Sequence, residues 1–97
     1  MARRRELEKY YLGDAAWKNS VSACALEWQR CRFKRRLVAT LEGNKDIAQV
    51  IYFLVGESSM EWVHEPIPEL DKVSPIECLR DPVLTMRLRS MLMRMPC

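Results

Sequence analysis

The second half of this chain is divided by prolines at positions typical of helix boundaries. In "SPIE", Ser74 can cap a helix that starts at the following proline, and Glu77 completes a capping box three residues after the cap. In "DPV", Asp81 repeats the pattern and predicts a last helix that runs to about Met95. Boundaries this closely spaced restrict the segment to short helices.

The stretch Glu61 to Leu79 contains three of these prolines and a charged loop. Pro66 and Pro68 end a short helix that begins near Ser58 or Ser59, because proline cannot continue a helical hydrogen-bond ladder. We interpret this stretch, called the joint below, as a connection that fixes the angle between short helices.

The segment from Asp14 to Leu41 contains no glycine or proline, and it predicts one long helix with Asp14 as its N-cap. Apolar residues recur at helical spacing along one face, and other apolar residues lie off this face, so the helix must be covered. Ordinary core packing and a homodimer interface both explain the first part of the face: Trp17, Val21, Cys24 and Trp28.

A second helix is expected over Lys45 to Val55, with Gly56 as a left-handed C-terminal cap. The same run, "IAQVIYFLV", could also form a strand, although no second convincing strand exists to pair with it. We therefore predict a single all-α domain, with one long N-terminal helix followed by a cluster of short helices. A basic helical region spans 1–44, and a second helical region spans 45–97.

Size and composition narrow the class of protein. At 97 residues the chain forms one small core, which association with another subunit would help to stabilise, so we expect a homo-oligomer. No apolar run reaches the roughly 20 residues of a membrane span, and no apolar signal core follows the first residues. These features predict a cytoplasmic protein with reduced cysteines.

The sequence offers little for catalysis. His64 is the only histidine, its spacing to Cys78 does not indicate a catalytic pair, and no glycine-rich phosphate loop is present. Cys24 and Cys31 would lie about 10 Å apart along a helix, too far apart to bind one zinc ion. We expect a noncatalytic protein with no catalytic residue, no cofactor and no metal.

Charge is unevenly distributed along the chain. Residues 1–42 carry ten basic and five acidic side chains, whereas residues 57–81 carry two basic and seven acidic ones. The run "RCRFKRR", with Arg3 to Arg5 as a further arm, suggests nucleic-acid binding; the alternative is a solvated face near a helix C-terminus. The candidate nucleic-acid residues are Arg30, Arg32, Lys34, Arg35 and Arg36.

Residues 45–95 resemble the C-terminal toxin-binding domain of the Xre/MbcA/ParS antitoxins, which act in bacterial toxin–antitoxin pairs. The resemblance is carried by "GESSMEWVHEPIPELDKVSPIECLRDPVLTMRLRSML", through Trp62-Val63, Pro66, Pro68, Leu70, Pro75, Leu79, Val83, Leu88 and Leu92. The first 44 residues contain no recognisable helix-turn-helix. The resemblance implies that the protein neutralises a partner toxin, possible partners including toxins of the RES type, and that it occurs in bacteria or phages.

Three hypotheses follow from these features. The first is an antitoxin-like inhibitor that binds a partner protein. Its candidate contacts are His64, Glu65, Glu69, Asp71, Lys72, Arg87, Arg89 and Arg94. The second is a small nucleic-acid-binding transcriptional regulator that uses the basic helix Arg30 to Arg36, and the third is a structural homodimer.

Overall fold

The computed structural model describes residues 11–95. The secondary-structure elements of this range are α-helices and short 3₁₀ turns. The first half contains α1 (Asp14–Ala23), α2 (Ala25–Trp28), α3 (Lys34–Thr40) and α4 (Lys45–Val55). The second half contains the 3₁₀ turn η2 (Gly56–Ser58), α5 (Ser59–Trp62), the 3₁₀ turn η3 (Pro68–Leu70), α6 (Pro75–Cys78) and α7 (Pro82–Arg94). The all-α prediction is confirmed, and the strand alternative for 47–55 is wrong, because these residues belong to α4.

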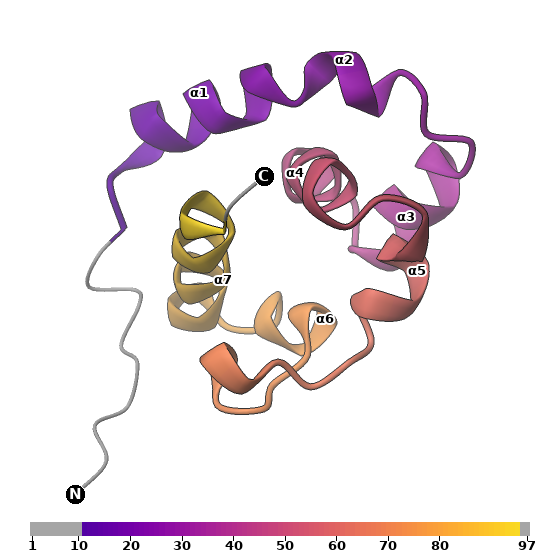
Figure 1. Ribbon diagram of the computed structural model, residues 1–97. Helices are drawn as coiled ribbons and strands as arrows, with labels where there is room; N and C mark the ends of the chain where they lie inside the picture. Colours follow the sequence, from indigo (N-terminus) through magenta and orange to yellow (C-terminus); the bar gives the residue numbers. More distant parts are fainter. Residues whose placement is uncertain (1–10, 96–97) are drawn as a thin grey trace, which may run out of the picture.

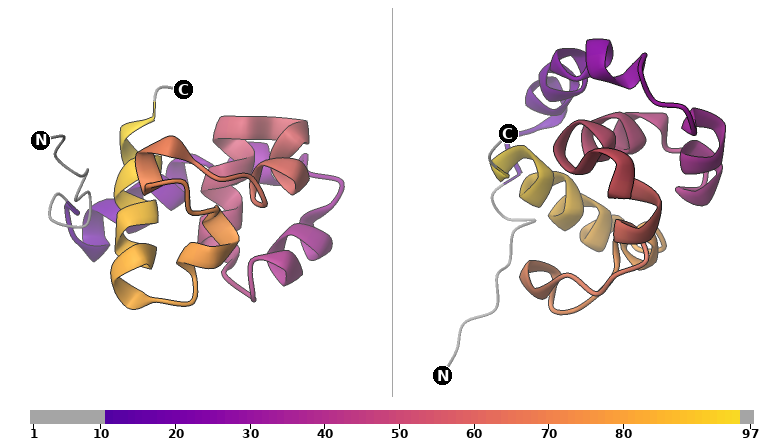
Figure 2. Two further views of the ribbon diagram at one scale, coloured as in Figure 1. Left: turned by 90° about the horizontal axis from the view of Figure 1, so that it is seen from below. Right: turned by 45° about the vertical axis from the view of Figure 1, so that its right-hand side comes forward.

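Helix α4 lies at the centre of the fold (Figure 1). It contacts α1, α2, α3, α5 and α7. Figure 2 shows α7 next to α4 from two further directions. Six consecutive residues, 47–52, are buried, so α4 is covered on all sides. A helix that is apolar all round needs such an enclosure, and the other elements supply it. No helix in the described range is long and apolar enough to cross a membrane.

The predicted long N-terminal helix is wrong. The chain leaves the helix at Cys24, with φ −94° and ψ 0°, and again between Trp28 and Lys34. These breaks allow α1, α2 and α3 to wrap around α4, which one straight rod could not do (Figure 1). The longest helix in 11–95 is instead α7, with 13 residues. Gly13, rather than Asp14, occupies the cap position of α1.

The predicted starts of α6 and α7 are confirmed, whereas α5 ends at Trp62, before the prolines that were expected to end it. Ser74 Oγ accepts a hydrogen bond from the Glu77 backbone N–H, and the Glu77 carboxylate accepts one from the Ser74 N–H, which completes the capping box. The bonds to the carboxylate lower the pKa of Glu77. Gly56 follows α4 with φ 72° and ψ −135°, so its φ is positive but its conformation is not the predicted left-handed cap.

Asp81 provides a direct test of the start of α7. Its Oδ1 accepts hydrogen bonds from the backbone N–H groups of Val83, at 2.8 Å, and Leu84, at 3.2 Å. We expect Asp81→Ala to lower the free energy of unfolding by about 0.5–2 kcal/mol in urea titrations, because it removes this cap. Asp81→Asn is the matched control and should lose far less, since asparagine also caps helices. Equal losses in the two variants would contradict the capping role.

Candidate functional site

The joint is held in one conformation by its own backbone. An isolated antiparallel bridge pairs Ile67 with Val73, where the Ile67 N–H donates to the Val73 carbonyl at 3.2 Å. The turn between them places Asp71 and Lys72 at φ 57° and 66°, a left-handed conformation that non-glycine residues seldom adopt. Leu70 is fully buried beneath it. The joint therefore presents its polar residues on a fixed framework.

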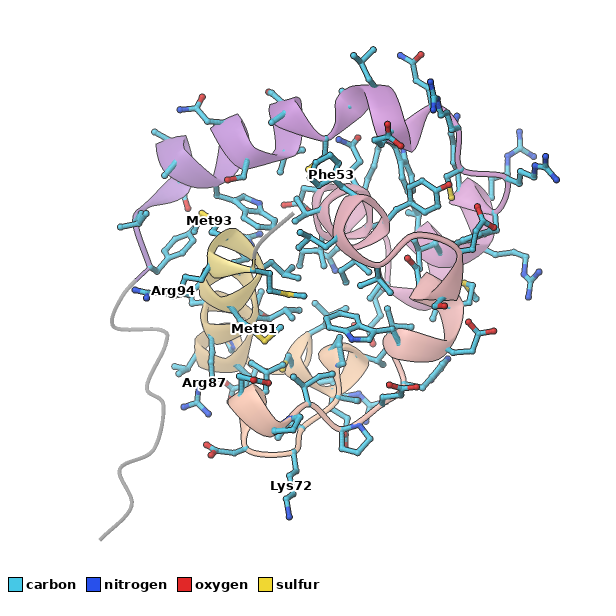
Figure 3. The ribbon with its side chains drawn as sticks, in the orientation of Figure 1. Phe53, Lys72, Arg87, Met91, Met93 and Arg94 are labelled. Carbon is cyan, nitrogen blue, oxygen red and sulfur yellow. The ribbon has the colours of Figure 1, made fainter. Side chains whose placement is uncertain are left out.

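The candidate contacts in the joint differ in exposure and in whether they pair with another side chain. The side chains of His64, Glu65 and Glu69 are exposed, and Lys72 points away from the body of the protein (Figure 3). Asp71 is half-buried and accepts a hydrogen bond from Arg87 at 3.2 Å, which ties the joint to α7. Four of the candidate contacts are thus accessible to a partner: His64, Glu65, Glu69 and Lys72. The fifth, Asp71, is paired with Arg87.

Arg89 contributes to the packing of the helices. It donates to Asp46 Oδ2 at 3.4 Å, and its guanidinium lies 5.3 Å from the centre of a Trp17 ring. Trp17 Nε1 also donates to Asp46 Oδ2, at 2.8 Å. Arg89 therefore links α1, α4 and α7, so reversing its charge should destabilise the fold as well as affect any partner. Arg94, near the end of the same helix, is exposed.

Helix α7 also presents two large apolar side chains that were not among the candidate contacts. Val83 is 50% exposed and Met86 is 38% exposed. They lie one turn apart, and Val83 also lies one turn before Arg87, so the three share one side of the helix. The signal was present in the sequence: Leu84, Leu88 and Leu92 recur at helical spacing and face the core, which leaves Val83 off the buried stripe.

The exposed side of α7 and the turn of the joint are together called the α7–joint face. The ion pair between Arg87 and Asp71 places the apolar pair on α7 next to the turn of the joint. Figure 3 shows Lys72 and Arg87 on this side of the protein. The face consists of Asp71, Lys72, Val83, Met86 and Arg87.

The basic residues of "RCRFKRR" do not lie on one long helix. Arg30 and Arg32 are exposed in the connection between α2 and α3, and Lys34, Arg35 and Arg36 form the first turn of α3. Lys34, Arg35 and Arg36 therefore lie at the N-terminus of a helix and not near the predicted C-terminus, where cations would favour the helix dipole. Arg30, Arg32, Arg35 and Arg36 are exposed, which agrees with the alternative of a solvated face. The Arg3 to Arg5 arm lies outside the described residues. Nucleic-acid binding stays a prediction.

The candidate dimer face packs against its own chain. Trp17, Cys24 and Trp28 are buried in the core, and Val21 is half-buried against it. The ring of Trp28 meets that of Tyr52 edge-on, with 6.3 Å between the ring centres. These side chains cover α4 and offer little surface to a second copy. Oligomerisation itself stays a prediction.

The described cysteines Cys24, Cys31 and Cys78 are buried, which makes them poor nucleophiles. Burial raises the pKa of Cys78 from 9.0 to about 11, with smaller contributions from Arg87, which lowers it, and Glu77, which raises it. Burial also raises the pKa of Cys31. Thiols with raised pKa values remain protonated near neutral pH, and the thiolate is the reactive form. Within residues 11–95 no group of three His, Cys, Asp or Glu side chains could hold a metal ion.

Comparison with known proteins identifies no relative. No protein-family model, curated protein or solved structure matches this chain. The inferred function therefore rests on the arrangement of its own residues and on the resemblance across residues 45–95.

Proposed function

We propose that this protein is a noncatalytic protein-binding module that neutralises a partner toxin by direct contact through the α7–joint face. The observation that carries the proposal is the exposure of Val83 and Met86, one turn apart on α7, beside the ion pair between Arg87 and Asp71. Apolar anchors within a polar rim are typical of protein-binding surfaces.

The rigidity of the joint supports the proposal. A surface that is already ordered loses less conformational entropy on association, and so more of its contact energy appears as affinity. The bridge between Ile67 and Val73 and the buried Leu70 hold the turn before any partner arrives. Loops positioned by a rigid scaffold are common sites of recognition.

The class of partner comes from the resemblance to antitoxins. The acidic joint, with Glu65 and Glu69 exposed, would suit a partner with basic residues around its contact surface. A toxin of the RES type is one candidate.

The proposal predicts the effect of placing charge in the apolar pair. Val83→Asp together with Met86→Asp should weaken the complex with the toxin at least roughly tenfold, because two carboxylates would be buried without partners. The matched control is Leu12→Asp with Ala15→Asp, which adds the same charge at exposed positions near the start of α1.

The measurement combines capture and protection. Tagged protein is used to capture partners from cells of the source organism at low and high salt, and the captured protein is then expressed alone and with each variant. A single stoichiometric partner, toxic alone and harmless with the wild type and the control, would support the proposal. Nucleic acid that is released at high salt, or equal failure of both double variants, would count against it.

A further inference from the structure

A second surface lies where α2, α3 and the start of α4 meet, at the upper right of Figure 1. The structure forms an open groove of about 670 Å³ between these elements. It shares no residue with the α7–joint face. Its lining residues are Ala25, Trp28, Gln29, Lys34, Arg35, Val38, Ala39, Lys45 and Gln49.

The floor and rim of this groove differ in chemistry. The floor consists of its least exposed residues: buried Trp28, half-buried Val38, and Gln49, whose amide already donates to the Val21 carbonyl at 3.3 Å. The rim carries three cations, Lys34, Arg35 and Lys45, and none of the groove's lining residues in the described chain is acidic. Three like charges without a counter-charge favour an anionic ligand.

We propose that this groove binds an acidic amphipathic segment of a partner polypeptide. Apolar side chains of the segment would cover Trp28 and Val38, and its carboxylates would pair with Lys34, Arg35 and Lys45. The groove and the α7–joint face share no residue and would bind different ligands, so binding in the groove does not require the function proposed for that face.

The same observations disfavour nucleic acid in the groove. Bases stack on exposed aromatic rings, but Trp28 and Phe33 both pack edge-on against Tyr52, with ring centres 6.3 and 5.7 Å from it. Arg36, the third consecutive cation of α3, does not line the groove, so the three do not form one row for phosphates there. A phosphate backbone would also leave the apolar floor unused.

The test uses a fluorescein-labelled helical peptide with leucines on one face and glutamates on the other. Fluorescence anisotropy is measured at physiological salt, where screening over about 8 Å keeps charge effects local. We expect Lys34→Glu with Arg35→Glu to weaken binding by roughly tenfold or more, since it reverses two rim charges. The control is Arg32→Glu with Arg36→Glu, which changes the net charge equally at residues outside the groove and should retain most of the affinity.

A variant that blocks the groove without changing its charge tests whether the peptide binds inside the groove. Ala39 is exposed and lines the groove, so Ala39→Tyr should obstruct the peptide without changing the charge or disturbing the core. Loss of peptide binding in this variant and in the Lys34/Arg35 variant, with retention in the Arg32/Arg36 variant, would support the proposal. Equal losses in both charge-reversed variants, absence of peptide binding to the wild type, or preferential binding of a labelled oligonucleotide would overturn it. The Val83/Met86 variant should bind the peptide normally, which distinguishes failure here from failure of the proposed function.

Discussion

Replacing Trp17 with alanine should lower the free energy of unfolding by about 3–5 kcal/mol, the range observed for large aromatic side chains lost from a core. Trp17 is only 3% exposed and fixes α1 against the rest of the fold. The substitution also removes the hydrogen bond from Nε1 to Asp46, at 2.8 Å, and the ring beneath Arg89. Urea unfolding followed by circular dichroism measures the effect.

Two further variants keep this prediction testable if Trp17→Ala does not fold. Trp17→Phe retains most of the packing but leaves Asp46 without the indole donor, so we expect a loss of about 1–3 kcal/mol. Leu26→Ala removes an apolar side chain that is exposed, and it should change stability by no more than about 0.5 kcal/mol. Similar losses for Trp17→Ala and Leu26→Ala would show that α1 does not dock as described.

The second large effect is alkaline destabilisation through Cys78. Burial raises the pKa of this thiol from 9.0 to about 11, so the folded chain holds the proton more tightly than the unfolded chain does. The corresponding stability is fully present below pH 9 and is lost as the pH rises towards 11. The loss amounts to about 2–3 kcal/mol, since each pKa unit corresponds to about 1.4 kcal/mol.

Cys78→Ala isolates this contribution from other groups that titrate at high pH. The pKa values of Tyr11, Cys31 and Tyr52 are also raised, each mainly by burial, and they contribute in both proteins. Unfolding free energies are measured from pH 8 to pH 11 for the wild type and the variant. We expect a steeper decline for the wild type, and parallel curves would show that Cys78 does not titrate in this way.

The parts of the fold that were predictable from sequence depend on local signals. The bounds of α4 followed from apolar spacing ended by Gly56, and the start of α7 followed from Asp81 and the proline after it. Ser74 and Glu77 identified the start of α6 for the same reason. In each case the residues that determine the structure lie within a few positions of one another.

The breaks in the N-terminal segment could not be predicted in this way. Cys24 lies within a segment that contains no glycine or proline, and no local sequence signal marks the break there. Apolar residues on more than one side of the segment did indicate that it needed a cover, and α4, with α7 against α1, provides it.

The candidate site was predictable only in part. The exposed residues of the joint follow from its prolines and charges, but the roles of Arg87 and Arg89 depend on partners far away in sequence. Arg89 donates to Asp46, 43 residues earlier, and Arg87 to Asp71, 16 residues earlier. No periodicity links such pairs, so both arginines resembled free surface charges in the sequence.

The central position of α4 has a thermodynamic consequence for binding. Helices that carry the α7–joint face and helices that carry the groove all pack on α4, and exposure of its apolar surface makes partial unfolding costly. Each surface therefore exists only while the whole chain is folded. A ligand that binds either surface raises the stability of the entire protein by RT ln(1 + [L]/Kd), and in doing so it preserves the other surface as well.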